Sequence, residues 1–221
     1  MRTFYRVIIK RFFDILVSLI IMPFVLLITI PVAIAILIED HGPIFYLDKR
    51  LGKNIKEFKM LKFRSMKVNS LDIRNEDGTT YNSVDDPRVT KVGKFIRKTS
   101  IDELPQIFNI LIGQMSFIGP RPSPLGNIEK YPKFYLKKFN VLPGLTGLDQ
   151  SQGRNSTSFL KHCETDIYYV EHISLWLDLK ILFMTIPVVF SHKGVYRNQP
   201  SKNNKVEANT KIIAEKKDEN K

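Results

Sequence analysis

The sequence predicts an α+β fold, mostly helical with one small β-hairpin, joined to an apolar N-terminal helix that enters a membrane. Residues 15–38 contain no charged side chain, which is typical of a membrane helix. Two apolar runs within residues 41–66 flank a glycine-containing turn at 52–54, a pattern that indicates strand, turn and strand. The apolar spacing in 94–112 and 160–190 predicts helices.

Differences in composition divide the 221 residues into three segments. Residues 1–40 hold the membrane helix, residues 41–199 form the main domain, and residues 200–221 are a polar tail that we expect to be disordered. The net charge is +12, of which +9 falls within residues 41–200. Such a surface favours the phosphates of nucleic acid, lipid heads or nucleotides. The single cysteine, Cys163, excludes an internal disulfide.

The apolar helix is long enough to cross a bilayer, because 24 residues rise about 36 Å and the hydrocarbon core is about 30 Å thick. Basic residues precede the helix, and a second basic cluster between Lys49 and Lys67 follows it. Both clusters are typical of the cytoplasmic side. Pro23 and Pro31 lack a helical N–H and are candidate break points for a helix that dips in and returns. A spanning helix tolerates the same prolines as kinks, so both arrangements stay open.

Proline and glycine mark the irregular parts of the main domain. Residues 67–92 are polar with turn signals and predict a loop, while the GPRPSP stretch at 119–124 is incompatible with a regular helix. Residues 142–155 predict a glycine-punctuated loop. The apolar segment 174–190 predicts a helix that packs on the core and is partly exposed at the membrane surface.

Two adjacent carboxylates, Asp102 and Glu103, follow a run of cations at a predicted helix start. Ser100 and Glu103 match a capping box, in which each side chain bonds the other residue's backbone amide. Pro105 fits this register poorly, since its missing N–H would cost a hydrogen bond, so the helix can also begin one or two residues later. Both registers place the carboxylates at a helix N-terminus, about 100° apart, which implies different roles. An ionised Asp among cations can bind Mg²⁺ or attack phosphorus, so a structural cap and an active site remain equal alternatives.

Two groups of residues are candidates for an anion site near these carboxylates. Arg121 stands between Pro120 and Pro122, whose restricted backbone lowers the entropy cost of a phosphate contact. Lys62 and Arg64 lie two positions apart, on one face of the predicted strand. A rigid surface turn and a solvated strand face are the ordinary alternatives.

A third candidate cation, Arg154, belongs to the glycine loop. Gly144, Gly147 and Gly153 would let the backbone approach a ligand closely, although plain turns use the same residue type. Patterns for other chemistries do not occur in the sequence: there is no P-loop, no G-x-S-x-G, no D-x-D, no zinc spacing and no RRM aromatic run.

Six motifs together resemble those of the bacterial monotopic phosphoglycosyl transferases, over roughly residues 5–190. They are K-R-x-x-D before the apolar helix, K-F-R-S-M, D-P-R, S-I-D-E-L-P-Q, M-S-F-I-G-P-R-P and P-G-L-T-G. Each motif alone is modest evidence, whereas six in this order are highly specific.

The resemblance implies an enzyme that moves a phosphosugar from a UDP-sugar to polyprenyl (undecaprenyl) phosphate and releases UMP, as the first membrane step of surface glycan assembly. It implies that Asp102 attacks the β-phosphate to form a covalent intermediate and ligates Mg²⁺, while Glu103 assists. The substrate-binding residues that it implies are Arg121 with Pro120 and Pro122, and less directly Arg97, Lys62, Arg64 and Arg154.

The resemblance also implies a location. UDP-sugars are cytosolic, so both flanks of the apolar helix lie in the cytoplasm and the helix is re-entrant in the bacterial inner membrane. Residues 41–199 are then a cytosolic catalytic domain. Membrane lipid is a partner and nucleic acid is not, while a homodimer is left open.

The sequence departs from the family pattern in two places. Many members have a Ser-Pro break about thirteen residues after the aspartate of K-R-x-x-D, where this chain has Leu27 with Pro23 and Pro31 about one turn on either side. A distributed bend is therefore an alternative to a break. Asp149 and Gln152 replace the usual apolar or small residue and Asn, which bears on the choice of donor sugar.

A second hypothesis comes from a different class of protein. A non-enzymatic, membrane-anchored adaptor would dock anionic lipid or nucleic acid through the basic face. It predicts salt-dependent binding of nucleic acid and no release of UMP from any UDP-sugar.

Overall fold

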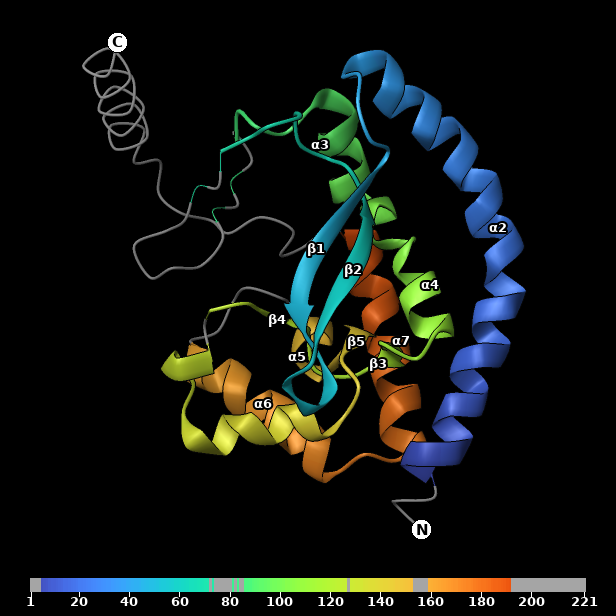
Figure 1. The fold of residues 1–221 in the computed structure, drawn as a ribbon. Coiled ribbons are helices and arrows are strands. Elements are labelled where there is room, and N and C mark those ends of the chain that lie inside the picture. Colours follow the sequence, from blue (N-terminus) through green and yellow to red (C-terminus); the bar gives the residue numbers. More distant parts are fainter. Residues whose placement is uncertain are drawn as a thin grey trace, which may run out of the picture.

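The computed structural model describes residues 5–71, 73, 81, 83, 86–126, 128–152 and 159–191. A two-stranded hairpin lies at the centre, with helices packed around it and the longest helix along one flank (Figure 1). The α-helices are α2 (Lys10–Glu39), α3 (Lys91–Lys98), α4 (Gln106–Leu111), α5 (Leu148–Ser151), α6 (Phe159–Glu171) and α7 (Leu175–Ser191). The strands are β1 (Phe45–Leu51), β2 (Glu57–Phe63), β3 (Ser116–Ile118), β4 (Ser123–Pro124) and β5 (Gly144–Thr146). A π-helical turn precedes α2, and the 3-10 turns are Lys53–Ile55, Ile101–Glu103, Ile128–Lys130 and Lys133–Asn140.

The predicted hairpin is confirmed. Strands β1 and β2 pair antiparallel over seven residues each, with Phe45 opposite Phe63 and Leu51 opposite Glu57. The turn falls at the expected place, after Gly52. Strand β4 pairs with β1 as a short third strand, while β3 and β5 form a separate parallel pair.

Three boundaries differ from the sequence-based prediction. The helix predicted at 94–112 is split into α3, a single 3-10 turn and α4, because Ser100 adopts a left-handed φ of 58° through which a right-handed helix does not continue. The helix predicted at 160–190 is divided into α6 and α7. The stretch 142–155, predicted as a loop, contains β5 and α5, so that prediction is wrong in part.

Helix α2 is one continuous helix of 30 residues that includes Pro23 and Pro31. A break at Pro23, at Pro31 or at both, and a distributed bend, are the alternatives; α2 bends as a gradual arc around the domain (Figure 1), which is the second of them. Prolines inside a helix commonly cause such bending. By length and composition α2 is able to cross a membrane.

The charged residues of K-R-x-x-D connect the first turns of α2 to the main domain through an ion pair and hydrogen bonds. Lys10 Nζ lies 2.5 Å from Asp178 Oδ2 on α7. Arg11 donates hydrogen bonds to the last two carbonyl oxygens of α4, at 2.5 and 2.7 Å. Asp14 accepts hydrogen bonds from Ser116 Oγ at 3.0 Å and from the next backbone amide of β3 at 3.1 Å.

The last turn of α2 is fastened to the same domain. The Glu39 carboxylate accepts hydrogen bonds from the first two backbone amides of α3, at 2.6 and 2.7 Å. Asp40 forms an ion pair with the buried guanidinium of Arg64, and Ile36 packs with Phe63 of the hairpin. Both ends of a helix about 45 Å long therefore contact one domain.

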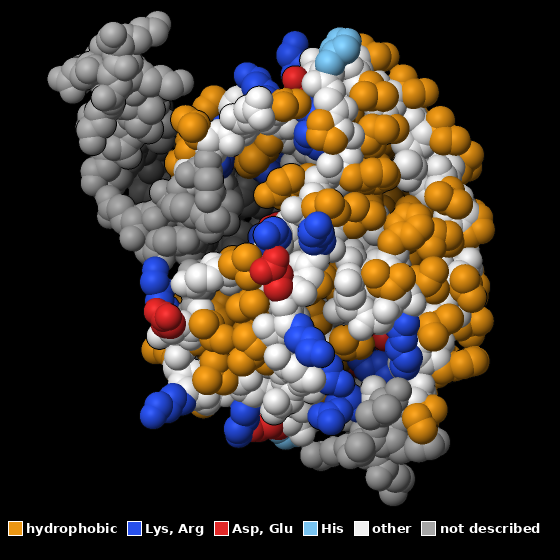
Figure 2. Space-filling view, viewed as in Figure 1, with side chains coloured by type: hydrophobic (Ala, Val, Ile, Leu, Met, Phe, Trp, Pro, Cys, Tyr) orange, Lys and Arg blue, Asp and Glu red, His pale blue; other side chains and the backbone are white. Residues whose placement is uncertain are grey.

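The outer side of α2 carries a continuous apolar surface, seen as the hydrophobic flank in Figure 2. Its side chains include Phe24 and Leu27, which are 64% and 69% exposed. Helix α7 also exposes a large apolar residue, Trp176 at 80%, while its Asp178 and Ile181 are buried. The predicted combination of core contact and exposure in α7 is confirmed.

Candidate active site

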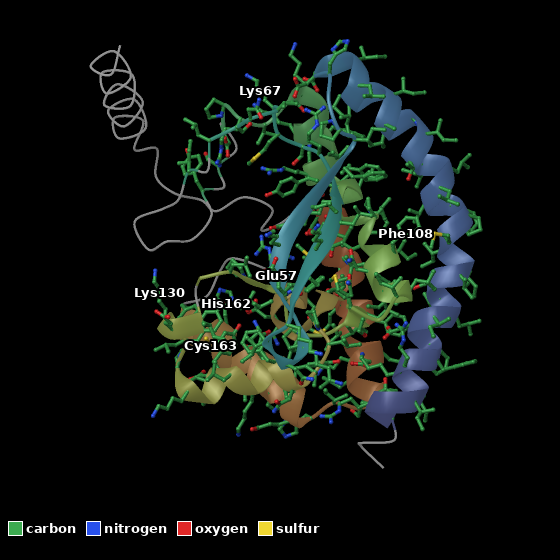
Figure 3. The ribbon with its side chains drawn as sticks, viewed as in Figure 1. Glu57, Lys67, Phe108, Lys130, His162 and Cys163 are labelled. Atoms are coloured by element: carbon green, nitrogen blue, oxygen red, sulfur yellow. The ribbon has the colours of Figure 1, made fainter. Side chains whose placement is uncertain are left out.

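Asp102 and Glu103 lie in the 3-10 turn between α3 and α4, beside strand β2. Their neighbours in the turn, Ile101 and Leu104, pack into the apolar cluster that contains Phe63. On the far side α4 packs against the hairpin, and Phe108 lies between α4 and α2 (Figure 3). The apolar–acidic–acidic–apolar order of I-D-E-L thus anchors the turn through its outer residues.

The predicted capping box does not form. The Ser100 side chain makes no capping hydrogen bond, and the backbone amide of Glu103 instead donates to the carbonyl oxygen of Ser100 at 3.2 Å. Helix α4 begins only at Gln106, directly after Pro105, where the missing N–H of proline breaks no helical bond. The two carboxylates therefore precede α4 and do not occupy its first turn.

Glu103 lies between two cations. Its Oε1 atom accepts a hydrogen bond from Arg121 Nη2 at 3.1 Å and lies 4.0 Å from Lys62 Nζ. The Lys62 side chain is 16% exposed, whereas that of Arg121 is 49% exposed. Burial lowers the pKa of Lys62, and the charge of Glu103 opposes this change. Lys62 is thus an interior cation of the site, and Arg121 approaches from the solvent side.

Asp102 is the less constrained of the two carboxylates. Burial raises its pKa to about 6, and the charge of Glu103 adds to the rise. Three nearby cations act in the opposite direction: Lys62, Arg97 and Arg121. Among the residues that the structure describes, none donates a hydrogen bond to the Asp102 carboxylate. Its oxygens are therefore available to a ligand, in a setting where cations balance the charge.

The two remaining described cations of the prediction have different surroundings. Arg97, in the last turn of α3, donates from Nε to Ser65 Oγ at 2.8 Å and adjoins Asp102. Arg64 follows the end of β2, is buried, and donates to the carboxylate and carbonyl of Asp40 and to the carbonyl of Pro43. The structure therefore brings Arg97 to the carboxylates and places Arg64 at the end of α2.

The Pro-Arg-Pro segment at 120–122 connects β3 to β4 and is not helical. The carbonyl of Pro120 accepts a hydrogen bond from the amide of Gly144 at 2.9 Å, which ties the segment to β5. Arg121 thereby has a stiff backbone on both sides and reaches Glu103. Arg154, the last predicted cation, lies outside the described residues.

The glycines of the 142–155 stretch serve a close crossing of two chain segments. A Cβ atom at Gly144 would lie 2.1 Å from the backbone nitrogen of Gly119, and one at Gly147 would lie 2.3 Å from its carbonyl oxygen. These contacts are between backbones, so they explain both glycines without a ligand. Gly153 lies outside the described residues.

Two charged residues of β1 adjoin the site and were not predicted. Asp48 Oδ2 lies 2.6 Å from Arg50 Nη2 and 3.9 Å from Lys62 Nζ. The antiparallel register puts Asp48 and Arg50 on the same face of the hairpin as Lys62. The alternation D-x-R in a strand opposite Lys62 is a signal from which they could have been found.

The carboxylates fit a magnesium ion that takes few protein ligands. Within the described residues no group of three or more His, Cys, Asp or Glu side chains is placed to hold a metal. Mg²⁺ commonly takes one or two carboxylates and completes its shell with water and substrate phosphates. Asp102 and Glu103 meet that requirement at a position where a diphosphate would be neutralised by neighbouring cations.

A hollow of about 350 Å³ lies elsewhere, at the turn of the hairpin. Its lining includes Lys53, Lys56 and Gln114, and none of the predicted site residues. We therefore assign it no part in the site.

Comparison with known proteins gives concordant results. The family model described as bacterial sugar transferase matches residues 5–192. The chain is 42% identical, over 195 residues, to a UDP-glucose:undecaprenyl-phosphate glucose-1-phosphate transferase of Klebsiella pneumoniae, covering 85% of this chain and 41% of that protein. It is 39% identical to the galactosyl transferase CpsE of Streptococcus agalactiae, covering 84% of this chain and 43% of that protein.

The chain covers different fractions of the length of its relatives. The chain spans about two fifths of the length of these two proteins. It matches 88% of the exopolysaccharide production protein ExoY of Sinorhizobium fredii, at 40% identity over 201 residues. The match to the family model covers most of the chain and includes every described residue of the site. The chain therefore belongs to the bacterial sugar transferase family.

Proposed function

We propose that the protein is a phosphoglycosyl transferase that moves a sugar phosphate from a UDP-sugar to undecaprenyl phosphate and releases UMP. The observation that carries this proposal is the state of Asp102: a carboxylate without hydrogen bonds from described residues, with a pKa of about 6, facing three cations. An ionised carboxylate among cations suits attack on a diphosphate. The names of several relatives, including that of the Klebsiella protein, describe this type of transfer.

In the first step a carboxylate oxygen of Asp102 attacks the β-phosphorus of the UDP-sugar. The bond between this phosphorus and the oxygen that bridges to the α-phosphate breaks, and UMP leaves with the bonding electron pair. Lys62 and Arg121 flank the carboxylates and neutralise the charge that develops on the phosphoryl oxygens. The product on the enzyme is an acyl phosphate that carries the sugar.

In the second step a phosphate oxygen of undecaprenyl phosphate attacks the same phosphorus. The bond to Asp102 breaks, which restores the carboxylate and yields undecaprenyl diphosphate sugar. Glu103 keeps a separate task, because its hydrogen bond to Arg121 positions the guanidinium that contacts the phosphate. Mg²⁺ held by Asp102 and Glu103 would shield the diphosphate charge.

We also propose that α2 enters one leaflet of the bacterial inner membrane and returns, with the domain on the cytoplasmic face. The attachment of both ends of α2 to one domain supports this topology, because a helix that crosses the bilayer would separate its ends. The exposed apolar surfaces of α2 and α7 would contact lipid. The undecaprenyl chain and the cytosolic nucleotide would then meet at one surface.

The chemistry is tested with UDP-sugars and no acceptor. Wild-type protein should release one equivalent of UMP, and intact-mass spectrometry with peptide mapping should locate a sugar phosphate on Asp102. The Asp102→Asn variant should release none and keep a wild-type unfolding temperature or a higher one. Full activity of Asp102→Asn would refute the mechanism. Absence of UMP release from every UDP-sugar, combined with salt-dependent nucleic-acid binding, would favour the adaptor.

The topology is tested by labelling single cysteines in spheroplasts with a membrane-impermeant reagent. Arg6→Cys and His41→Cys lie at exposed positions on either side of α2, and the buried Cys163 is replaced by Ala. Neither cysteine should react until the membrane is opened. Labelling of one of them from outside the cell would show that α2 spans the membrane.

A further inference from the structure

We propose that the hollow at the turn of the hairpin binds the phosphate headgroup of an anionic phospholipid. Lys53 and Lys56, which line it, would hold the phosphate, and Ile55 between them would enter the layer of acyl chains. The inference rests on the proposed function only for the placement of α2 in one leaflet, which brings the hollow to the lipid surface. It adds a lipid site that is separate from the carboxylates and from the apolar surfaces of α2 and α7.

The hollow lies between the end of the hairpin and the segment that follows α4. Its volume of about 350 Å³ is near the lower end of the usual range for ligand sites. Lys53 and Lys56 line it from the hairpin, and Gln114 lines it from the segment after α4. The lining includes one carboxylate, that of Glu57, which lies 3.4 Å from the Lys49 ammonium. The hollow therefore has two lysines and one carboxylate that another cation neutralises.

The ammonium groups of Lys53 and Lys56 are available to an anion. Both side chains are exposed, and neither forms an ion pair or a side-chain hydrogen bond with any residue that the structure describes. Lysine and arginine side chains gather over the end of the hairpin and beside the first turns of α2 (Figure 2). A cationic surface of this kind attracts anionic lipid headgroups.

The turn holds Ile55 in a backbone conformation that is costly for isoleucine. Asn54 and Ile55 have left-handed φ angles of 58° and 60°, as in the type I′ turns that favour Asn-Gly. A β-branched residue is rare in this conformation, and glycine would relieve the strain. Ile55 is also 45% exposed, so burial in the core does not account for an apolar side chain at this position. Strained residues often serve a function, and contact with lipid would be one.

The rim of the hollow adjoins the membrane helix. Arg11, in the first turns of α2, donates hydrogen bonds to the last two carbonyl oxygens of α4. A Cβ atom at Gly113, which lines the hollow, would lie 3.4 Å from the same guanidinium. Ile112, the residue before Gly113, is 67% exposed. A lipid whose phosphate occupies the hollow would therefore have apolar side chains of this protein beside its acyl chains.

The acceptor phosphate that reacts at Asp102 is a different phosphate. Glu57 at the hollow and Lys62 at the carboxylates are five residues apart in β2, which separates them by about 17 Å. A phosphate in the hollow is therefore too far away to react. Nucleic acid would match the lysines but would leave Ile55 and Ile112 without a partner. A phospholipid of the bilayer matches both the charges and the apolar side chains.

Native mass spectrometry of the full chain in a nonionic detergent measures the retention of added lipids. Wild type should bind phosphatidylglycerol at least tenfold more tightly than phosphatidylcholine. The double variant Lys53→Gln, Lys56→Gln should bind phosphatidylglycerol about tenfold to thirtyfold more weakly, because each lysine near an anionic lipid surface contributes about fivefold. Inorganic phosphate should displace no more lipid than NaCl does at equal ionic strength. Displacement specific to phosphate would indicate a site for free anions and overturn the assignment to lipid.

The matched control is the double variant Lys59→Gln, Lys130→Gln. Both lysines are exposed and lie outside the lining of the hollow, and Lys130 is on the side of the domain away from α2 (Figure 3). The control should lose less than twofold in affinity for phosphatidylglycerol. Equal losses in the two double variants would overturn the proposal, since the effect would then depend on net charge alone.

A fluorescent label on the turn tests the role of Ile55. Bimane is attached to Ile55→Cys in a chain with Cys163→Ala, and the protein is placed in nanodiscs of phosphatidylcholine with or without about 30% phosphatidylglycerol. Lipids with a nitroxide near the headgroup should quench the label at least twofold more when phosphatidylglycerol is present. Absence of quenching in both nanodiscs would show that the turn does not reach the bilayer and would overturn the proposal.

The stability of Ile55→Asn shows whether the fold itself requires the isoleucine. Asparagine tolerates a left-handed φ, so this variant should unfold at the wild-type temperature or above it. A lower unfolding temperature would show that packing within the fold accounts for Ile55 and would remove its role at the membrane.

Measurement of UMP release separates this site from the proposed reaction. Both double variants should release UMP from a UDP-sugar at the wild-type rate when no acceptor is present. Loss of release in Lys53→Gln, Lys56→Gln alone would place the hollow in the substrate site and overturn the proposal. A preference for phosphatidylglycerol that requires Lys53 and Lys56, in a chain that releases no UMP from any UDP-sugar, would retain the lipid site and reject the proposed function.

Discussion

Glu103 and Arg121 are joined by a hydrogen bond of 3.1 Å that connects the turn before α4 to the segment between β3 and β4. The two residues are 18 positions apart, and the Arg121 side chain is half exposed. An arginine fixed in this manner can hold a phosphate with little further loss of entropy.

Arg121→Ala should therefore lower kcat/KM for UMP release by about a hundredfold to a thousandfold, as is common when a group that stabilises a developing anion is removed. Arg121→Lys should recover only part of the loss, since an ammonium cannot form two parallel bonds to phosphate. The unfolding temperature of both variants should match wild type within about 2 °C, because the side chain is half exposed. Wild-type kinetics in Arg121→Ala would remove this arginine from the site.

Activity should depend on the ionisation of Asp102. Its pKa of about 6 means that the attacking carboxylate is protonated in an increasing share of molecules as pH falls through that value. The rate of UMP release in the absence of acceptor should be half-maximal near pH 6 and should fall about tenfold per unit below it. Omitting the acceptor removes the titration of its phosphate from the profile.

The control for this profile is Glu103→Gln. The charge of Glu103 contributes to the raised pKa of Asp102, so its removal should move the half-maximal point to lower pH even though the maximal rate falls. A profile that stays flat down to pH 5 in the wild type would contradict the assignment of Asp102 as the nucleophile.

The same pKa predicts an effect of Asp102 on stability. A carboxyl whose pKa is higher in the folded chain than in the unfolded chain binds its proton more tightly when folded. Its favourable contribution is therefore complete below about pH 4 and is lost as pH rises through about 6. Asp102→Asn, which resembles the protonated acid, should unfold at a higher temperature than wild type at pH 7.5, by the equivalent of up to about 3 kcal/mol for a pKa raised to about 6.

That difference should nearly disappear at pH 3, where Asp102 is protonated in the folded chain and mostly protonated in the unfolded chain. Thermal unfolding in detergent at the two pH values measures it. An Asn variant that is less stable than wild type at pH 7.5 would show that the ionised carboxylate is satisfied by the fold and is not held at a cost for catalysis.

Substitution of Arg64 should lower the stability of the fold and leave substrate binding unchanged, whereas substitution of Arg121 should do the reverse. It is buried and bonds the carboxylate of Asp40 and two backbone carbonyls, so Arg64→Met leaves these groups without their partner. We expect a loss of about 3 kcal/mol in the free energy of unfolding. At a temperature where the variant is folded, its KM for UDP-sugar should equal that of the wild type. A raised KM without loss of stability would return Arg64 to the anion site.

The hairpin was easier to predict from the sequence than the points at which the helices begin and end. The hairpin followed from two apolar runs and a glycine turn, and its register brings Asp48, Arg50 and Lys62 to one face. The division of the 94–112 segment depends on a left-handed serine, Ser100, a conformation for which serine carries no strong signal. Spacing also could not separate Lys62 from Arg64, because the strand ends at Phe63 and the two side chains then find different partners.

The glycines show a second limit of prediction from the sequence, which concerns contacts between distant residues. A glycine in a sequence indicates that a side chain is not tolerated, and it does not say what occupies the space. At Gly144 the neighbour is the backbone of Gly119, a contact between residues 25 positions apart that only the folded chain reveals.

The fastening of α2 at both ends has a practical consequence for making this protein soluble. Deletion of α2 would remove Lys10 from Asp178, Arg11 from the last carbonyls of α4 and Glu39 from the first amides of α3. A shortened chain would therefore lose the frame that supports the carboxylates, together with its attachment to lipid. A water-soluble enzyme should instead be sought by replacing the outward-facing apolar residues of α2 with polar ones, while Lys10, Arg11, Asp14, Glu39 and Asp40 are kept. Helix α2 is therefore a structural part of the domain, and only its outer, apolar surface requires a membrane.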